Sequence, residues 1–110
     1  MNKYHAHKAE LDGITFDSKA ERDRYAQLKL LLRAGEISDL TLQPEFELIP
    51  SYRKNGRTVR AIKYRADFMY KKNGETVIED VKGVRTKEFV IKKKLMEWRY
   101  PELTITEVRA

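Results

Sequence analysis

The dipeptide Asn73-Gly74 lies between two stretches rich in β-branched and aromatic residues. Asn-Gly is the strongest short signal for a two-residue β-hairpin, because both residues tolerate the positive φ angles of the turn. We therefore predict that a strand ending near Lys72 pairs with a strand running from Glu75 to Lys82. The turn also fixes the register, since Lys72 must face Glu75 and every later pair follows from that one.

This register places Asp67 directly opposite Asp80. Opposed residues of an antiparallel pair point to the same face, with Cβ atoms about 4.5–5.5 Å apart, so the two carboxylates should repel each other. Either the strand is a charged edge that faces water, or the acids form a chemical site on a rigid element. Met69 and Ile78 fall on the same predicted face, which favours the site. Two carboxylates are suitable ligands for a hard cation such as Mg²⁺ or Mn²⁺.

Lys82 follows Asp80 by two residues and should project from the same face, with Arg65 opposite it. A lysine beside a metal-bound carboxylate pair can orient an attacking water and stabilise the charge that develops on a phosphate. Glu79 should point to the other face, where we expect a structural role or one that supports the site from outside.

The rest of the chain predicts two helices and further strands. Residues 17–35 form the clearest helix, with Asp17 or Ser18 as its cap, an apolar stripe that includes Tyr25, Leu28 and Leu32, and Gly35 as its stop. A second helix should run from a Thr86 cap to about Tyr100, with Ile91, Leu95 and Trp98 as its stripe. Strands are expected over 39–50, where Pro44 suggests an edge or a bend, over 59–71 and over 103–109. The order αβββαβ predicts one α+β domain over 13–110, with a mixed, mainly antiparallel sheet flanked by two helices, after a flexible tail at 1–12.

Glu21 is a further candidate for the site. It lies at the end of the core-facing stripe of the first helix, from which an acid could reach over the sheet toward Asp67 and Asp80. Ser18 and Glu21 also fit a capping box, in which the glutamate has a structural role. The two roles are compatible, and the sequence leaves both open.

Positive charge is concentrated in the second half of the chain. The net charge is +6, yet residues 1–51 hold seven basic against nine acidic side chains, whereas residues 52–110 hold sixteen against eight. Such polarity favours a polyanionic partner, because each neutralised phosphate releases counterions, although a solvated basic surface is the simpler alternative. Membrane surfaces and acidic proteins are also attracted to such a surface, but we expect a nucleic acid as the partner, bound by Arg53, Lys54, Arg57, Arg60, Arg65, Arg85, Lys87, Lys92 and Lys93.

Composition limits the remaining options. A chain of 110 residues with 41% hydrophobic and 36% charged residues suits one globular domain, and its small core leaves room for a homodimer. There are no cysteines, so disulfides and thiolate metal sites are excluded. No stretch is apolar enough for a membrane span or a signal peptide, and we expect a cytoplasmic protein.

Taken together, these residues resemble the PD-(D/E)XK nuclease superfamily, whose signature is an acid followed by acid-x-Lys. The segments "GITFDSKAERDRYAQL", "YRADFMY" and "EDVKGVRTKEFVIKKKL" look more closely like a small phage and prophage group of endonuclease-like proteins, and the likeness spans residues 13–102. Two positions depart from the pattern: Ala66 stands where the superfamily has its proline, and Asp80 where many members have glutamate.

The resemblance implies a restriction-endonuclease-like core and a phosphodiester hydrolase. It implies metal ligands at Asp67 and Asp80, the Val81 carbonyl as a third ligand, Lys82 as a catalytic residue, and Glu21 as an additional acid from the first helix. The expected function is thus a Mg²⁺- or Mn²⁺-dependent endodeoxyribonuclease that acts on duplex or branched DNA, such as a Holliday junction, in phage DNA metabolism. A catalytically silent DNA-binding module and a small structural or interaction protein remain as alternatives.

Overall fold

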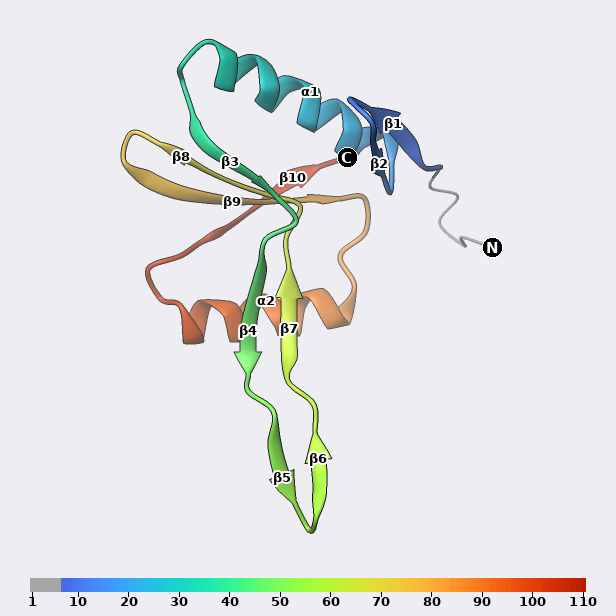
Figure 1. Ribbon diagram of the computed structural model, residues 1–110, viewed down its shortest axis with the longest axis vertical. Coiled ribbons are helices and arrows are strands. Elements are labelled where there is room, and N and C mark those ends of the chain that lie inside the picture. The colour runs from blue at the N-terminus through green and yellow to red at the C-terminus, as the bar shows by residue number, and fades with distance from the viewer. Residues whose placement is uncertain (1–6) are drawn as a thin grey trace.

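The computed structural model describes residues 7–110, which form a single small α+β domain (Figure 1). The two helices of this part are α1 (Lys19–Arg33) and α2 (Lys87–Arg99). The strands are β1 (Ala9–Leu11), β2 (Ile14–Phe16), β3 (Ser38–Leu42), β4 (Glu45–Ile49), β5 (Tyr52–Lys54), β6 (Arg57–Val59), β7 (Ile62–Arg65), β8 (Phe68–Lys72), β9 (Glu75–Lys82) and β10 (Ile105–Arg109).

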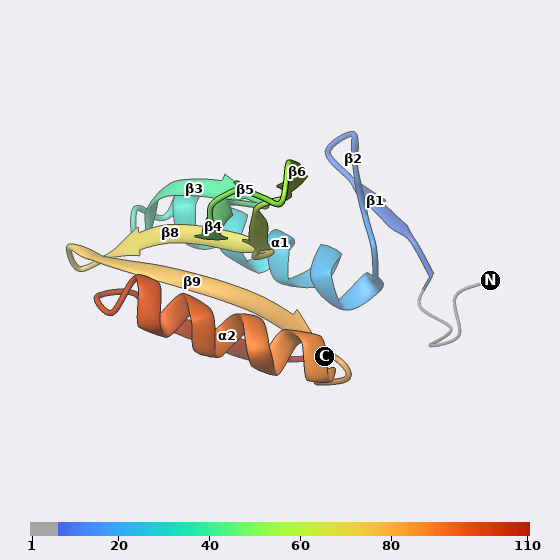
Figure 2. The same cartoon turned by 90° about the horizontal axis from the view of Figure 1, so that it is seen from below.

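A four-stranded sheet of order β10-β9-β8-β3 forms the centre of the fold. Strands β3, β8 and β9 pair antiparallel, whereas β10 runs parallel to β9, so the sheet is mixed as expected. Figure 2 shows α1 and α2 on opposite faces of this sheet. Of these helices, none is long and apolar enough to cross a membrane.

The side chains of β9 alternate between two hydrophobic cores. On the α1 face the core comprises Phe16, Tyr25, Leu28, Ile37, Phe68 and Tyr70. On the α2 face it comprises Leu48, Tyr64, Ala66, Ile78, Phe89, Met96 and Ile105. Because successive residues of a strand point to opposite faces, this alternation also sends the charged residues at the end of β9 to different sides.

Both helices begin where the sequence predicts. Ser18 is the N-cap of α1 and accepts a hydrogen bond from the Glu21 N–H at 3.1 Å, while Thr86 caps α2 through the Phe89 N–H at 3.1 Å. Gly35, with a φ of +77°, follows the end of α1. The left-handed conformation suits glycine and stops the helix.

The apolar stripe predicted for α2 is wrong. Ile91 and Trp98 are 59% and 78% exposed, and Leu95 is half-buried, whereas Phe89 and Met96 face the core. Phe89, Val90 and Ile91 are three consecutive apolar residues, so the sequence pattern does not identify the buried face. Trp98 is therefore a surface residue, and the half-buried Tyr100 donates a hydrogen bond from its hydroxyl to the Glu47 carbonyl at 2.8 Å.

Two of the predicted long strands are broken. The strand expected over 39–50 bends at Gln43, which has a φ of +50°, and the next residue, Pro44, leads into β4. The strand expected over 59–71 is divided into β6, β7 and β8. As a result β4 pairs with β7, and β5 pairs with β6, in a finger that projects from the body in Figure 1.

Regular structure also begins earlier than predicted. Strand β1 pairs with β2 from Ala9 to Phe16, so residues 9–11 do not belong to a flexible tail. These residues pair because the positive φ angles of Asp12 and Gly13 make a tight turn between the two strands. Residues 1–6 of the expected tail lie outside the described part of the chain.

Candidate active site

The register set by Asn73-Gly74 is confirmed from Lys72↔Glu75 to Phe68↔Glu79. Asp67 immediately precedes β8, and its N–H still donates to the Glu79 carbonyl at 3.1 Å. Its Oδ2 atom then accepts the Val81 N–H at 2.7 Å. The Asp67 side chain thus replaces the backbone acceptor that β8 no longer supplies, and this bond fixes its carboxyl group beside the end of β9.

The predicted pairing of Arg65 with Lys82 is wrong. Arg65 pairs with Glu45 of β4, because the chain leaves β9 between β7 and β8. The buried Ala66 lies at this change of direction, and its N–H donates to the Pro44 carbonyl at 3.1 Å. The bend brings Tyr64, which precedes it on β7, onto the α2 face of the central sheet.

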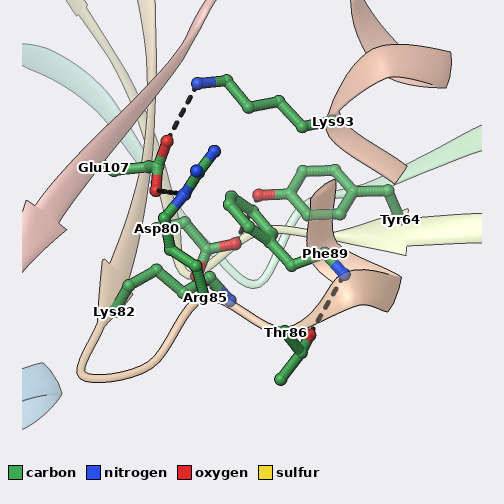
Figure 3. Close-up of polar contacts among 8 residues, drawn as sticks. All are labelled: Tyr64, Asp80, Lys82, Arg85, Thr86, Phe89, Lys93 and Glu107. Atoms are coloured by element: carbon green, nitrogen blue, oxygen red, sulfur yellow. Dashed lines mark hydrogen bonds and ion pairs between the residues drawn. The ribbon is translucent and has the colours of Figure 1, made fainter. Parts of the chain in front are cut away.

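Asp80 has two partners within the described chain. The Tyr64 hydroxyl donates to Asp80 Oδ2, and Lys82 Nζ lies 3.1 Å from Asp80 Oδ1. Figure 3 shows Tyr64 and Lys82 around Asp80, with Phe89 beside them. The Lys82 ammonium lies 4.2 Å from the centre of the Phe89 ring, a cation–π geometry that fixes its position. The prediction that Lys82 lies beside Asp80 is confirmed.

The two aspartates create a local excess of negative charge. The pKa of Asp67 is raised to about 8, mainly by burial, with the charges of Asp80 and Glu21 acting in the same direction and the Val81 hydrogen bond opposing them. Burial and the bond to Asp80 also raise the pKa of Tyr64 far above its ordinary value, so Tyr64 remains a donor. Two carboxyl groups that cannot easily be ionised together form a site for a proton or a cation.

Glu21 joins this group from α1. Its side chain is only 6% exposed, and burial raises its pKa, with the charges of Asp17 and Asp80 acting in the same direction. A cleft of about 690 Å³ is lined by Glu21, Asp67, Asp80, Val81 and Lys82 together. The five residues predicted to hold a metal or to act in catalysis are therefore neighbours in space, although the first and last lie more than sixty positions apart in the chain.

The oxygen atoms of this site suit an ion such as Mg²⁺ that takes only a few of its ligands from the protein. Among residues 7–110, no three His, Cys, Asp or Glu side chains are close enough to hold a metal by themselves. Mg²⁺, however, is commonly held by one or two carboxylates, with waters and substrate phosphates as its other ligands. The Val81 N–H points to Asp67, and the N–H and carbonyl of a strand residue share one edge, so the Val81 carbonyl also faces this side. Asp67, Asp80 and the Val81 carbonyl would hold such an ion.

Glu79 lies on the α1 face, as expected for a structural residue. Its carboxylate accepts two hydrogen bonds from Arg24, at 2.8 and 2.6 Å, and one from the Tyr70 hydroxyl. Its exposure is 2%. A buried carboxylate with a bidentate arginine and a phenol is fully neutralised, so Glu79 has no charge left for a ligand.

The predicted DNA-binding residues lie in four places. Arg65 and Lys92 line a second hollow, of about 380 Å³, that shares Asp80 and Lys82 with the cleft. Arg85 and Lys93 both pair with Glu107, at 2.7 and 2.9 Å (Figure 3). Lys92 pairs with Glu88 at 3.1 Å. Lys87 is exposed at the start of α2, and the other four lie on the projecting finger: Arg53, Lys54, Arg57 and Arg60.

Sequence reasoning missed two residues of the site. Tyr64 was not among the predicted site residues, yet it is buried and bound to Asp80. Lys63 lines the 380 Å³ hollow beside Arg65. Both lie in the basic run before Asp67. They reach the site because the chain bends where Ala66 bonds to Pro44, and no local sequence pattern reveals this bend.

The comparisons with known proteins identify a family without a described activity. The whole chain, residues 1–110, matches the family described as "Protein of unknown function (DUF1064)", and the chain belongs to that family. No curated protein matches the chain.

Proposed function

We propose that this member of the DUF1064 family is a divalent-metal-dependent endodeoxyribonuclease. The observation that supports the proposal most strongly is the convergence of Glu21, Asp67, Asp80 and Lys82 on one open cleft. The resemblance to the PD-(D/E)XK superfamily gives the same four residues. Mg²⁺ or Mn²⁺ would supply, when bound, a water of lowered pKa and a positive charge for the scissile phosphate.

Each residue has a role that its contacts allow. Asp67 and Asp80 provide carboxylate oxygens, and Tyr64 holds the Asp80 carboxylate in a fixed orientation through its hydroxyl. Lys82 can donate from its ammonium group to a phosphate oxygen or to the attacking water, because it lies at the surface of both hollows. Such a positioned cation stabilises negative charge as it develops in the transition state.

Glu21 has a supporting role in this arrangement. Its backbone N–H is bound to the Ser18 cap, while its carboxyl group lines the cleft. Because burial and acidic neighbours raise its pKa, Glu21 can hold a proton near the site or share a water with the ion. The cap and the site therefore use different atoms of the same residue.

The substrate that we propose is duplex or branched DNA. Arg65, Lys63 and Lys92 surround the hollow next to Asp80 and provide positive charge for a phosphate backbone beside the scissile bond. A homodimer would allow the two strands of a junction to be cut symmetrically.

The test is cleavage of supercoiled plasmid and of a four-way junction with Mg²⁺, with Mn²⁺ or with EDTA. Asp80→Asn and Lys82→Ala should each lower the metal-dependent cleavage rate by about 10²-fold or more. Asp23→Asn and Lys71→Ala, which change the same residue types at exposed positions, should retain the rate. Cleavage that survives both site substitutions in folded protein would refute the assignment.

A catalytically silent DNA-binding module is the second candidate. The specific observation in its favour is that no three acidic or histidine side chains in the described chain form a metal cluster. This candidate predicts salt-dependent DNA binding with no cleavage under any metal. It also predicts that Mg²⁺ leaves the melting temperature of the protein unchanged.

A further inference from the structure

The structure contains a basic β-hairpin, residues 52–59, whose function the active site does not explain. We call it the arm; it consists of β5, the turn Asn55-Gly56 and β6, and every residue from 51 to 60 is exposed. Figure 1 shows the arm at the end of the finger, far from both helices. An exposed two-stranded ribbon with no core of its own is marginally stable in water, so the arm adds little to the stability of the fold and leaves its basic side chains free for a partner.

The two faces of the arm differ in chemistry. The pairs Tyr52↔Val59 and Lys54↔Arg57 share one face, and the pair Arg53↔Thr58 lies on the other. The Arg53 guanidinium donates to the Gly56 carbonyl at 2.8 Å and to Thr58 Oγ1 at 3.2 Å. Arg53 therefore stabilises the turn, and the face with Lys54 and Arg57 remains free to bind.

The tip of the arm opposes two like charges. Lys54 faces Arg57 directly, an arrangement that destabilises a β pair, and no ion pair to either residue occurs within residues 7–110. The β8-β9 hairpin has the same Lys-Asn-Gly turn, but there Lys72 faces Glu75. The two hairpins thus share Lys-Asn-Gly and differ in the residue that follows the glycine, which is Arg57 in the arm and Glu75 in the β8-β9 hairpin. Of these two hairpins, only the arm lacks an acid opposite its lysine.

The size of the arm indicates which groove it can enter. A pair of strands is about 4.8 Å apart, and the major groove of B-DNA, about 12 Å wide, admits a two-stranded ribbon. The minor groove is about 6 Å wide and is too narrow for it. We propose that the arm inserts into the major groove of duplex DNA, with Lys54 and Arg57 contacting the DNA at its tip.

The position of the arm relates this contact to the cleft. Tyr64, which binds Asp80, lies on β7 at the base of the finger, eight positions along the chain from Gly56 in the turn. At about 3.3 Å per residue, the tip lies up to about 26 Å from Tyr64. With about 3.4 Å per base pair, the arm would contact duplex up to about eight base pairs from the scissile phosphate. This inference rests on DNA as the substrate of the proposed nuclease.

The decisive variant is Arg57→Glu, because it would give the arm the lysine-glutamate pair that already folds in the β8-β9 hairpin. Lys71→Glu is the matched control, since it makes the same charge change at an exposed position of the other hairpin. Binding to a fluorescent 30-base-pair duplex is measured by anisotropy in EDTA, so that no cleavage occurs. Arg57→Glu should weaken binding by about tenfold or more and reduce the salt slope by about one, while Lys71→Glu should change affinity less than about twofold.

The groove is tested separately by dimethyl sulfate, which methylates guanine N7 in the major groove. Guanines contacted by the arm should be protected by the unmodified protein and reactive with Arg57→Glu. Equal effects of Arg57→Glu and Lys71→Glu would refute the proposal, as would equally tight, Arg57-dependent binding to duplex RNA, whose major groove side chains cannot read.

The outcome is distinguishable from that of the proposed nuclease activity. Duplex binding that depends on Arg57, with no cleavage under any metal, would refute the nuclease and support the arm. Metal-dependent cleavage combined with duplex binding that is insensitive to Arg57→Glu would support the nuclease and refute the role of the arm.

Discussion

Asp67→Asn should stabilise the metal-free protein, although it removes a proposed metal ligand. The side chains are nearly isosteric, and the amide oxygen of asparagine can still accept the Val81 N–H bond that Asp67 accepts at 2.7 Å. What the substitution removes is a buried negative charge beside Asp80 and Glu21. Without a bound cation the neighbouring carboxylates repel one another, so the loss of one carboxylate should favour folding.

The magnitude follows from the pKa of Asp67. Its increase from the ordinary 3.8 to about 8 corresponds to about 6 kcal/mol, at 1.36 kcal/mol per pKa unit. Because Lys82 lies close and water enters the open cleft, we expect about 1–3 kcal/mol of stabilisation at pH 8. A folded-state pKa above the unfolded one means that the native state binds the extra proton, so the native protein loses stability as pH rises from about 4 to about 8.

The assay is urea unfolding in EDTA at pH 3 and at pH 8. At pH 3 Asp67 is protonated in both the native and the unfolded protein, so the variant should differ from the unmodified protein by less than about 0.5 kcal/mol. At pH 8 the variant should be more stable, with a melting temperature raised by about 5–15 °C. Destabilisation at pH 8, or an equal effect at both pH values, would refute the view that Asp67 and Asp80 repel each other.

Glu79→Gln is the matched control, because it alters a buried carboxylate on the opposite face of the same strand. Glu79 is paired with Arg24 and Tyr70, so its replacement leaves a partly buried guanidinium without its partner. We expect a loss of about 2–4 kcal/mol. The two substitutions should therefore change stability in opposite directions.

Three further outcomes are expected. Mg²⁺ or Mn²⁺ should raise the melting temperature of the unmodified protein more at pH 8 than at pH 6, since binding must displace the Asp67 proton. The same ions should leave the melting temperature of Asp67→Asn unchanged, and differential scanning fluorimetry measures the melting temperature of each protein. Ser18→Ala should cost about 1 kcal/mol in urea unfolding, because the Glu21 N–H loses its cap. On α2, Trp98→Ser should change stability by less than about 0.5 kcal/mol, whereas Met96→Ala should cost about 2–5 kcal/mol, because only Met96 is buried.

Local signals predicted the centre of the fold and most of the candidate site. The Asn73-Gly74 turn determines the β8-β9 register, because a two-residue loop allows little else, and this register brings Asp67 and Asp80 together. Ser18 and Thr86 mark the helix starts through hydrogen bonds to residues only three positions away. Such contacts depend on a few neighbouring residues, so a sequence pattern can reveal them.

Features that depend on distant contacts could not be predicted. Arg65 lies opposite Lys82 only if one strand continues through Ala66, and the chain instead turns there to pair β7 with β4. The face of α2 that is buried depends on how the helix packs against the sheet. The helix sequence does not determine it, since the buried Phe89 and the exposed Ile91 are both apolar. The arm likewise exists because β4 and β7 carry it away from the body (Figure 1).

The two faces of β9 give an internal argument for a cation at the site. The chain neutralises Glu79 completely, with a bidentate arginine and a phenol. The opposite face receives one ammonium group, from Lys82, for the acids Asp67 and Asp80, while Glu21 adds a third acid nearby. A protein whose charges served only stability or solubility would gain by placing a second arginine there. Because the fold can provide such a residue and does so on one face only, we propose that a positive ion from solution balances the charge on the other face.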